Sequence, residues 1–158
     1  MTLRPSLPAE EPTYDASRPF PSLLPLYNYP IPNIPGKSVV VVQVTFPPNG
    51  STPPHTHPGA FVVGYVVSGY VFNARNKDPM EIKGPGENFT EHPGCRHRIS
   101  NNASDKAPAV LIATFVVDTE IAEAGMDALV VIDEEYRELV REAQEKTGAD
   151  RGRSNRDI

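Results

Sequence analysis

The four histidines of the chain all lie between positions 55 and 97. Two of them form the run His55-Thr56-His57, and residues i and i+2 of a β-strand point to the same face. Both imidazoles can therefore reach one metal ion, although an isolated H-x-H run also suits a solvated or hydrogen-bonded pair. His97 follows a Pro-Gly turn and is the third candidate ligand. The three side chains predict a site for one divalent ion, with iron, zinc, nickel and manganese as candidates.

These histidines lie in two segments that resemble the two motifs of the cupin superfamily. The first motif is broadly G-x5-H-x-H-x3or4-E-x6-G and resembles residues 49–69. The second is broadly G-x5-P-x-G-x2-H-x3-N and resembles residues 86–101. The resemblance extends over roughly residues 37–118 and is closest to small one-domain cupins. It implies a double-stranded β-helix, or jelly-roll barrel, with His55, His57 and His97 as metal ligands.

The sequence departs from this pattern at the family's ligand glutamate. That position falls at Val62, or at Phe61 with the shorter spacing, and neither side chain can bind a metal. Three neutral histidines leave a divalent ion with about two positive charges and an open position, which catalytic sites keep. Glu91 is the candidate to replace the carboxylate, because it precedes the turn that delivers His97 at an even spacing. The alternative is a solvated turn carboxylate.

Two residues are candidates for catalysis. Glu91 could act as a general acid or base. Tyr65 could expose its hydroxyl in the cavity and hydrogen-bond a substrate, unless it only packs in the core. We expect His92 at the surface or behind the ligands, and Cys95 as a packed thiol near the site, because further cysteines at zinc-finger spacing are absent.

The elements that must position these residues are predicted to be β-strands. Residues 37–118 alternate between short β-branched runs and turn sequences, as in a closed antiparallel barrel, and residues 107–118 form a buried strand of it. Residues 1–36 are rich in proline, so we expect an extended arm there, with the first 15 or so residues loose. Residues 119–158 predict a helix capped by Asp133 and ending before Gly148, followed by a polar tail.

Composition narrows the classes of partner. The chain has 158 residues, which suits one domain, and its net charge of −5 disfavours nucleic acid as a partner. Its apolar runs are too short for a membrane-spanning helix. One cysteine and an N-terminus without a signal-like apolar stretch favour a cytoplasmic protein.

An open metal site favours a metal-dependent enzyme acting on a small oxygen-rich molecule. The resemblance implies dioxygenase, isomerase, decarboxylase or lyase chemistry, among which the fold does not select. The alternative is a non-catalytic ligand-binding protein whose metal anchors the ligand or is structural. By analogy with cupins, and because the arm is apolar, we expect a homodimer.

Overall fold

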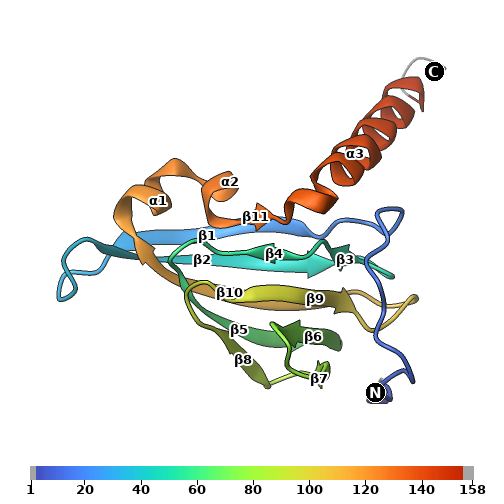
Figure 1. Ribbon diagram of the computed structural model, residues 1–158, viewed down its shortest axis with the longest axis horizontal. Helices are drawn as coiled ribbons and strands as arrows, with labels where there is room; N and C mark the ends of the chain where they lie inside the picture. The colour runs from blue at the N-terminus through green and yellow to red at the C-terminus, as the bar shows by residue number, and fades with distance from the viewer. Residues whose placement is uncertain (1–2, 155–158) are drawn as a thin grey trace.

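The computed structural model describes residues 3–154 and folds them mainly into two antiparallel sheets that form a barrel (Figure 1). The first sheet has five strands in the order β1 (Ser22–Pro30), β2 (Lys37–Phe46), β10 (Ala109–Asp118), β5 (Phe61–Ser68) and β8 (Asn88–Glu91). The second has the order β11 (Val131–Ile132), β4 (His55–Thr56), β9 (Arg96–Asn102), β6 (Val71–Arg75) and β7 (Glu81–Lys83), with β3 (Ser51–Thr52) paired to β9. The expected all-β double-stranded β-helix is confirmed.

The core lies between the two sheets, and alternation along strands such as β10 supplies much of it. In β10, Leu111, Phe115 and Val117 are buried while their neighbours are partly exposed. Val42 and Phe46 of β2 join the same cluster. This alternation aims every second side chain into the barrel, which is where the candidate ligands must point.

The proline-rich arm is ordered and contributes a strand to the barrel. Strand β1 pairs with β2 from Ser22, opposite Thr45, to Pro30, opposite Ser38. It lies at the edge of its sheet, where a proline costs no ladder hydrogen bond. The first segment, which was predicted to be loose, contacts the barrel at Glu11, whose carboxylate binds Arg98 and accepts a hydrogen bond from the Met80 backbone amide.

The C-terminal segment is helical as expected, but with more structure than the sequence suggested. Residues 119–133, here called the cap, contain α1 (Thr119–Ala124), α2 (Met126–Leu129) and β11. Helix α3 (Glu134–Ser154) then projects away from the strands (Figure 1). It begins after Asp133 as expected, but it continues through Gly148, because an interior glycine costs only about 1 kcal/mol. Residues 155–158 of the predicted tail lie outside the described residues.

Within residues 3–154, the helices are all too short or too polar to cross a lipid bilayer.

Candidate metal centre

Four buried side chains from three neighbouring parts of the barrel converge in its interior. His55 lies on β4 directly opposite His97 on β9, His57 follows two residues after His55, and Glu91 ends β8. Each offers one ligand atom, and these atoms all lie within 4.8 Å of one another. All four residues are buried, with relative exposures between 3% and 7%. The structure therefore brings the three predicted histidine ligands and Glu91 together.

The hydrogen bonds of the first two histidines fix which nitrogen each presents. Nδ1 of His55 lies 2.7 Å from the carbonyl oxygen of Pro53, and Nδ1 of His57 lies 2.7 Å from that of Leu129. A carbonyl oxygen only accepts, so both Nδ1 atoms donate and both Nε2 atoms carry lone pairs. These two Nε2 atoms are 3.2 Å apart. Two lone pairs at this distance repel each other, and a cation bound by both nitrogens would relieve that repulsion.

His97 is held through its other ring nitrogen, Nε2, and by a side chain rather than a backbone carbonyl group. Its Nε2 lies 2.7 Å from Oδ1 of Asn73, whose amide nitrogen donates to Glu81 at 3.1 Å. That second bond orients the amide, so Nε2 of His97 is the donor and Nδ1 carries the lone pair. Nδ1 faces Oε1 of Glu91 at 3.2 Å.

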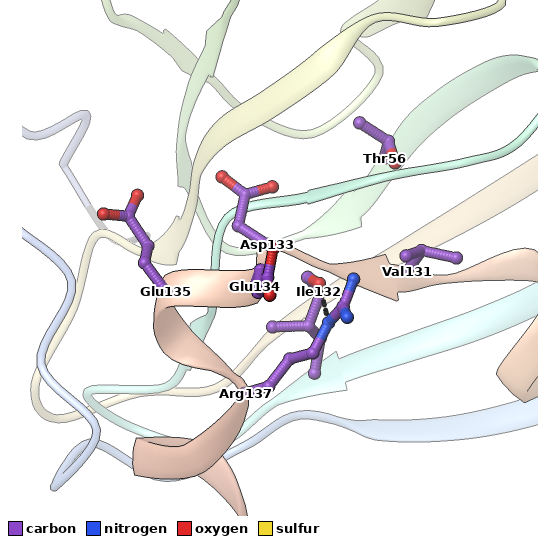
Figure 2. A pocket seen from close by; sticks show the side chains of 7 residues that line it. All are labelled: Thr56, Val131, Ile132, Asp133, Glu134, Glu135 and Arg137. Carbon is purple, nitrogen blue, oxygen red and sulfur yellow. Dashed lines mark hydrogen bonds between the residues drawn. The ribbon is translucent and has the colours of Figure 1, made fainter.

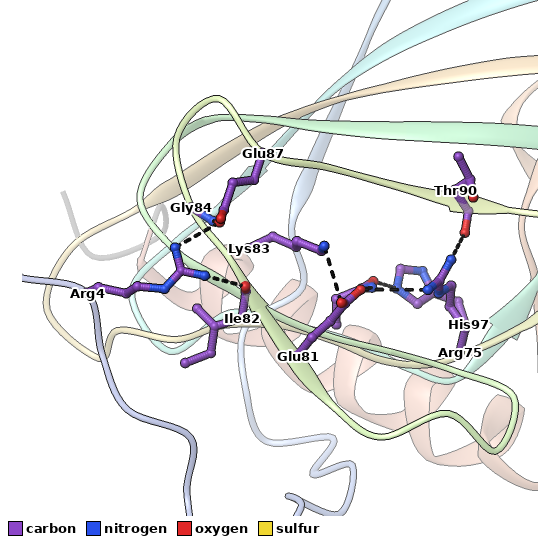
Figure 3. Close-up of polar contacts among 10 residues, drawn as sticks. Arg4, Arg75, Glu81, Ile82, Lys83, Gly84, Glu87, Thr90 and His97 are labelled. Carbon is purple, nitrogen blue, oxygen red and sulfur yellow. Dashed lines mark hydrogen bonds and ion pairs between the residues drawn. The ribbon is translucent and has the colours of Figure 1, made fainter.

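Two cations also contact the group that supports the Asn73 amide. Glu81 is 3.2 Å from the Lys83 ammonium and 3.7 Å from the Arg75 guanidinium (Figure 3). Arg75 also donates to the backbone carbonyl of Thr90, next to Glu91 on β8. The network thus ties the strand that carries Glu91 to the support of His97.

Glu91 is the least satisfied polar group at the site. Its Oε2 has no hydrogen-bond partner among the described residues and lies 3.7 Å from Nε2 of His57. Burial raises the pKa of Glu91 to about 7 and lowers the pKa of His55 to about 3. A proton shared by Glu91 and His97 would satisfy the contact between these two residues. It would leave the facing Nε2 atoms of His55 and His57, and Oε2 of Glu91, without a donor. The donor set of three imidazoles and one carboxylate fits a divalent ion instead.

The missing family carboxylate has a structural counterpart on the next strand. Val62, where the cupin pattern expects glutamate, pairs directly with Glu91 in the register of β5 and β8. The two side chains therefore start from adjacent points of the same sheet. With Glu91 as a donor, a divalent ion would keep about one net positive charge rather than the two expected from histidines alone.

The remaining sequence candidates lie away from these donors. Tyr65 is 48% exposed, because Val66 points inward from β5 and the neighbouring residue must point outward, so the expected hydroxyl in the cavity is wrong. His92 is exposed and packs edge-on against the Phe61 ring at 5.8 Å. Cys95 is buried, as expected.

Sequence reasoning missed the groups that orient the histidines. Asn73 is 1% exposed and lies in the strand VFNAR. The only sign of its role in the sequence is a polar residue within a predicted strand, since a buried asparagine needs hydrogen-bond partners. The carbonyl groups of Pro53 and Leu129 have no signal at all, since every residue carries one. Leu129 also lies 72 residues from the histidine it supports.

A cavity of about 70 Å³ adjoins the four donors, which form part of its wall. Its other walls are mainly apolar and come from the barrel interior, the arm and the cap. A second, more open hollow of about 610 Å³ lies outside β4, lined by Thr56, β11 and the residues that follow β11 (Figure 2). Thr56 points away from the two histidines that flank it, so this hollow does not share the donors.

Comparisons with known proteins agree with this architecture. Residues 42–115 match the Cupin_2 family model, described as the cupin domain. The chain is 32% identical over 90 residues to the putative germin-like protein 2-2 of Oryza sativa subsp. japonica, with 51% of this chain and 39% of that protein covered. It is 34% identical over 90 residues to germin-like protein subfamily 2 member 2 of Arabidopsis thaliana, with 54% and 40% covered. The chain spans about two fifths of the length of these curated relatives.

Solved structures share the fold. A conserved protein with a double-stranded β-helix domain from Klebsiella pneumoniae subsp. pneumoniae superposes with a TM-score of 0.53 at 17% identity, covering 70% of this chain and 93% of that chain. Oxalate oxidase in complex with the substrate analogue glycolate gives 0.50 at 22% identity, covering 70% and 61%. With the two motifs, the barrel and the buried histidines, residues 42–115 form a cupin domain.

Proposed function

We propose that this cupin is a metal-dependent enzyme that transforms a small oxygen-rich organic molecule. The observation that supports the proposal is the convergence of acceptors: two imidazole Nε2 atoms stand 3.2 Å apart with their protons committed elsewhere, and Glu91 Oε2 beside them is unpartnered. His55, His57, His97 and Glu91 would hold the ion. A bound divalent ion would supply Lewis-acid polarisation of a ligand oxygen, or redox chemistry if it is iron or manganese.

The protein's own groups would bind, orient and shield the reacting molecule. The apolar walls of the adjoining cavity keep bulk water out and strengthen electrostatic interactions inside. Glu91 would also take up or return a proton, through whichever carboxylate oxygen the ion leaves free. Oxygenase, isomerase, decarboxylase and lyase chemistry are all compatible with this arrangement.

A non-catalytic role is the second candidate. The number of protein ligands, four, is the observation in its favour. Four protein ligands can complete a tetrahedral zinc site, as in structural zinc centres. The cavity beside the donors favours the enzyme instead, since a purely structural ion needs no adjoining space. A metal that resists exchange, in a protein that binds no small acid, would favour the structural role.

Metal analysis tests the centre directly. Protein purified without added metal is analysed by plasma mass spectrometry, and metal-free protein is titrated with each candidate ion. We expect about one equivalent of metal, lost in His57→Ala and retained in the control His92→Ala, which removes an exposed imidazole. Protein that stays empty after every ion is added would refute the metal centre.

A carboxylate swap tests the part assigned to Glu91. Glu91→Val should weaken metal binding, whereas the double variant Glu91→Val with Val62→Glu should recover part of it, because the two positions are register partners. Equal metal affinity in all three proteins would remove Glu91 from the centre. Turnover of small hydroxy or oxo acids by the metal-loaded protein, reduced in Glu91→Gln, then separates an enzyme from a binding protein.

The edge strand supports a further part of the proposal, a homodimer. Leu24, Leu26 and Tyr29 of β1 are between 43% and 62% exposed on a strand with a free edge. Light scattering coupled to size exclusion would give twice the chain mass of 17.3 kDa for a dimer. A monomeric mass at high protein concentration would reject it.

A further inference from the structure

The cavity beside the four donors is small. Its volume is about 70 Å³, and a single enclosed water needs roughly 10–15 Å³ of such space. The cavity therefore has room for a ligand of about five to seven non-hydrogen atoms. A sugar acid or a polycyclic phenol exceeds this size.

The walls combine few polar side chains with many apolar ones. Beyond the four donors, the polar side chains that line the cavity are Thr52 and Ser100, and both are hydroxyls. Among the described lining residues there is neither a lysine nor an arginine. A second anionic group on a ligand would therefore be buried without a counter-charge, which is strongly unfavourable.

Part of the apolar wall, here called the apolar end, comes from outside the matched cupin domain. Phe20 and Leu23 reach the cavity from the arm, and Met126 and Val130 reach it from the cap. All four lie outside residues 42–115. Ligand selection at this end is thus a property of this chain's own additions to the barrel.

Charge balance sets the number of anionic groups. Three neutral imidazoles and one carboxylate leave a divalent ion with about one positive charge. A single carboxylate on the ligand neutralises it, and a neighbouring hydroxyl or oxo group adds a second oxygen donor. We infer that the site accepts a short-chain 2-hydroxy- or 2-oxo-monocarboxylic acid whose hydrocarbon end packs against Met126 and Val130. This inference rests on the proposed metal-dependent function.

A matched pair of acids tests the ligand class. 2-Hydroxybutyrate and malate share a four-carbon chain with the same hydroxy-acid head, and differ by a methyl or a carboxylate at the far end. Each is titrated into metal-loaded protein by calorimetry, and the protein-bound metal is measured afterwards to exclude stripping. We expect 2-hydroxybutyrate to bind at least about tenfold more tightly, as an unpaired buried polar group would require.

A wall variant tests the apolar end. Met126 is only partly buried, so Met126→Ala should fold and lengthen the cavity. In the variant, we expect the binding affinity for 2-hydroxyhexanoate to rise relative to that for 2-hydroxybutyrate, by about fourfold for each added methylene that becomes buried. Met80→Ala is the control, because it removes the same side chain from a separate cluster with Ala74 and Ile99. Its chain-length preference should match that of the wild type.

The outcomes separate this inference from the proposed function. Metal binding together with the expected preference supports both. Metal binding with malate bound equally or more tightly, or with neither acid bound, overturns the ligand class and leaves the metal centre intact. Failure to bind any metal overturns both.

Discussion

Replacing Asn73 by leucine should weaken metal binding without touching a proposed ligand. The change removes the acceptor that holds Nε2 of His97 at 2.7 Å and the donor that reaches Glu81. Leucine has the same number and branching of non-hydrogen side-chain atoms as asparagine, so the change removes polarity and roughly keeps the shape. Nε2 of His97 would then keep its proton without an acceptor, or pass it to Nδ1, the atom that faces Glu91.

The burial of His97 and its bond to Asn73 determine how much Asn73→Leu should lower folding stability and metal affinity. His97 is 4% exposed, and a buried donor left without a partner costs about 1–3 kcal/mol of folding stability. For a chain of 158 residues that corresponds to a fall of about 2–12 °C in the unfolding midpoint of the metal-free protein. Loss of a partner that orients a ligating histidine typically costs about 10–100-fold in metal affinity.

Three measurements follow the change. Circular dichroism gives the unfolding midpoint of metal-free protein, and competition with a chromophoric chelator gives the zinc affinity. Nitrogen NMR of the imidazole rings reports the tautomer: we expect the proton of His97 on Nε2 in the wild type and a mixture in Asn73→Leu. The tautomer distinguishes positioning of the ring from a general loss of stability.

Asn33→Leu is the control, because Asn33 is exposed in a turn and should change neither metal affinity nor the tautomer of His97. An unchanged zinc affinity in Asn73→Leu, with His97 still protonated on Nε2, would refute the reasoning that Asn73 positions this ring.

Three further changes test other parts of the structure. Glu91→Gln should stabilise metal-free protein increasingly as pH rises from 4.5 to about 7, by up to about 3 kcal/mol, because burial raises the pKa of Glu91 to about 7 and the unfolded carboxyl ionises first. Urea unfolding at several pH values measures this, and saturating metal should reverse the order; a flat difference across the range would contradict it. Gly64→Ala should cost about 1–3 kcal/mol, since its Cβ would overlap the Phe89 ring that packs beside His97, and adding Phe89→Leu should relieve the cost in a double-mutant cycle. Tyr65→Phe should leave metal content and ligand affinity unchanged, because the exposed side chain lies outside the cavity, and a loss of either would return Tyr65 to the site.

The sequence predicted most of the barrel and the positions of the histidines. Strand alternation and two motifs suffice to aim His55, His57 and His97 inward, because a side chain's face follows from its parity along the strand. The same parity places Tyr65 outside once Val66 is known to point inward, but the run FVVGYVVS is apolar at both parities and does not show which face is buried. Where a rule of local geometry applies, the sequence is sufficient.

The remainder depends on contacts between distant segments. Val62 pairs with Glu91 because of the register between β5 and β8. The sequence of either strand alone does not determine that register. The bond from His57 to the Leu129 carbonyl uses a group that every residue has. Helix α3 passes through Gly148 because one glycine lowers helix stability without forbidding the helix.

The bond between His57 and the Leu129 carbonyl has a consequence for how molecules enter. The cap supplies Met126 and Val130 to the wall of the cavity, and the same short segment holds a proposed metal ligand in its working tautomer. If a molecule too large for the cavity displaced the cap, it would also take the acceptor away from His57. Binding of such a molecule and retention of the ion would therefore oppose each other.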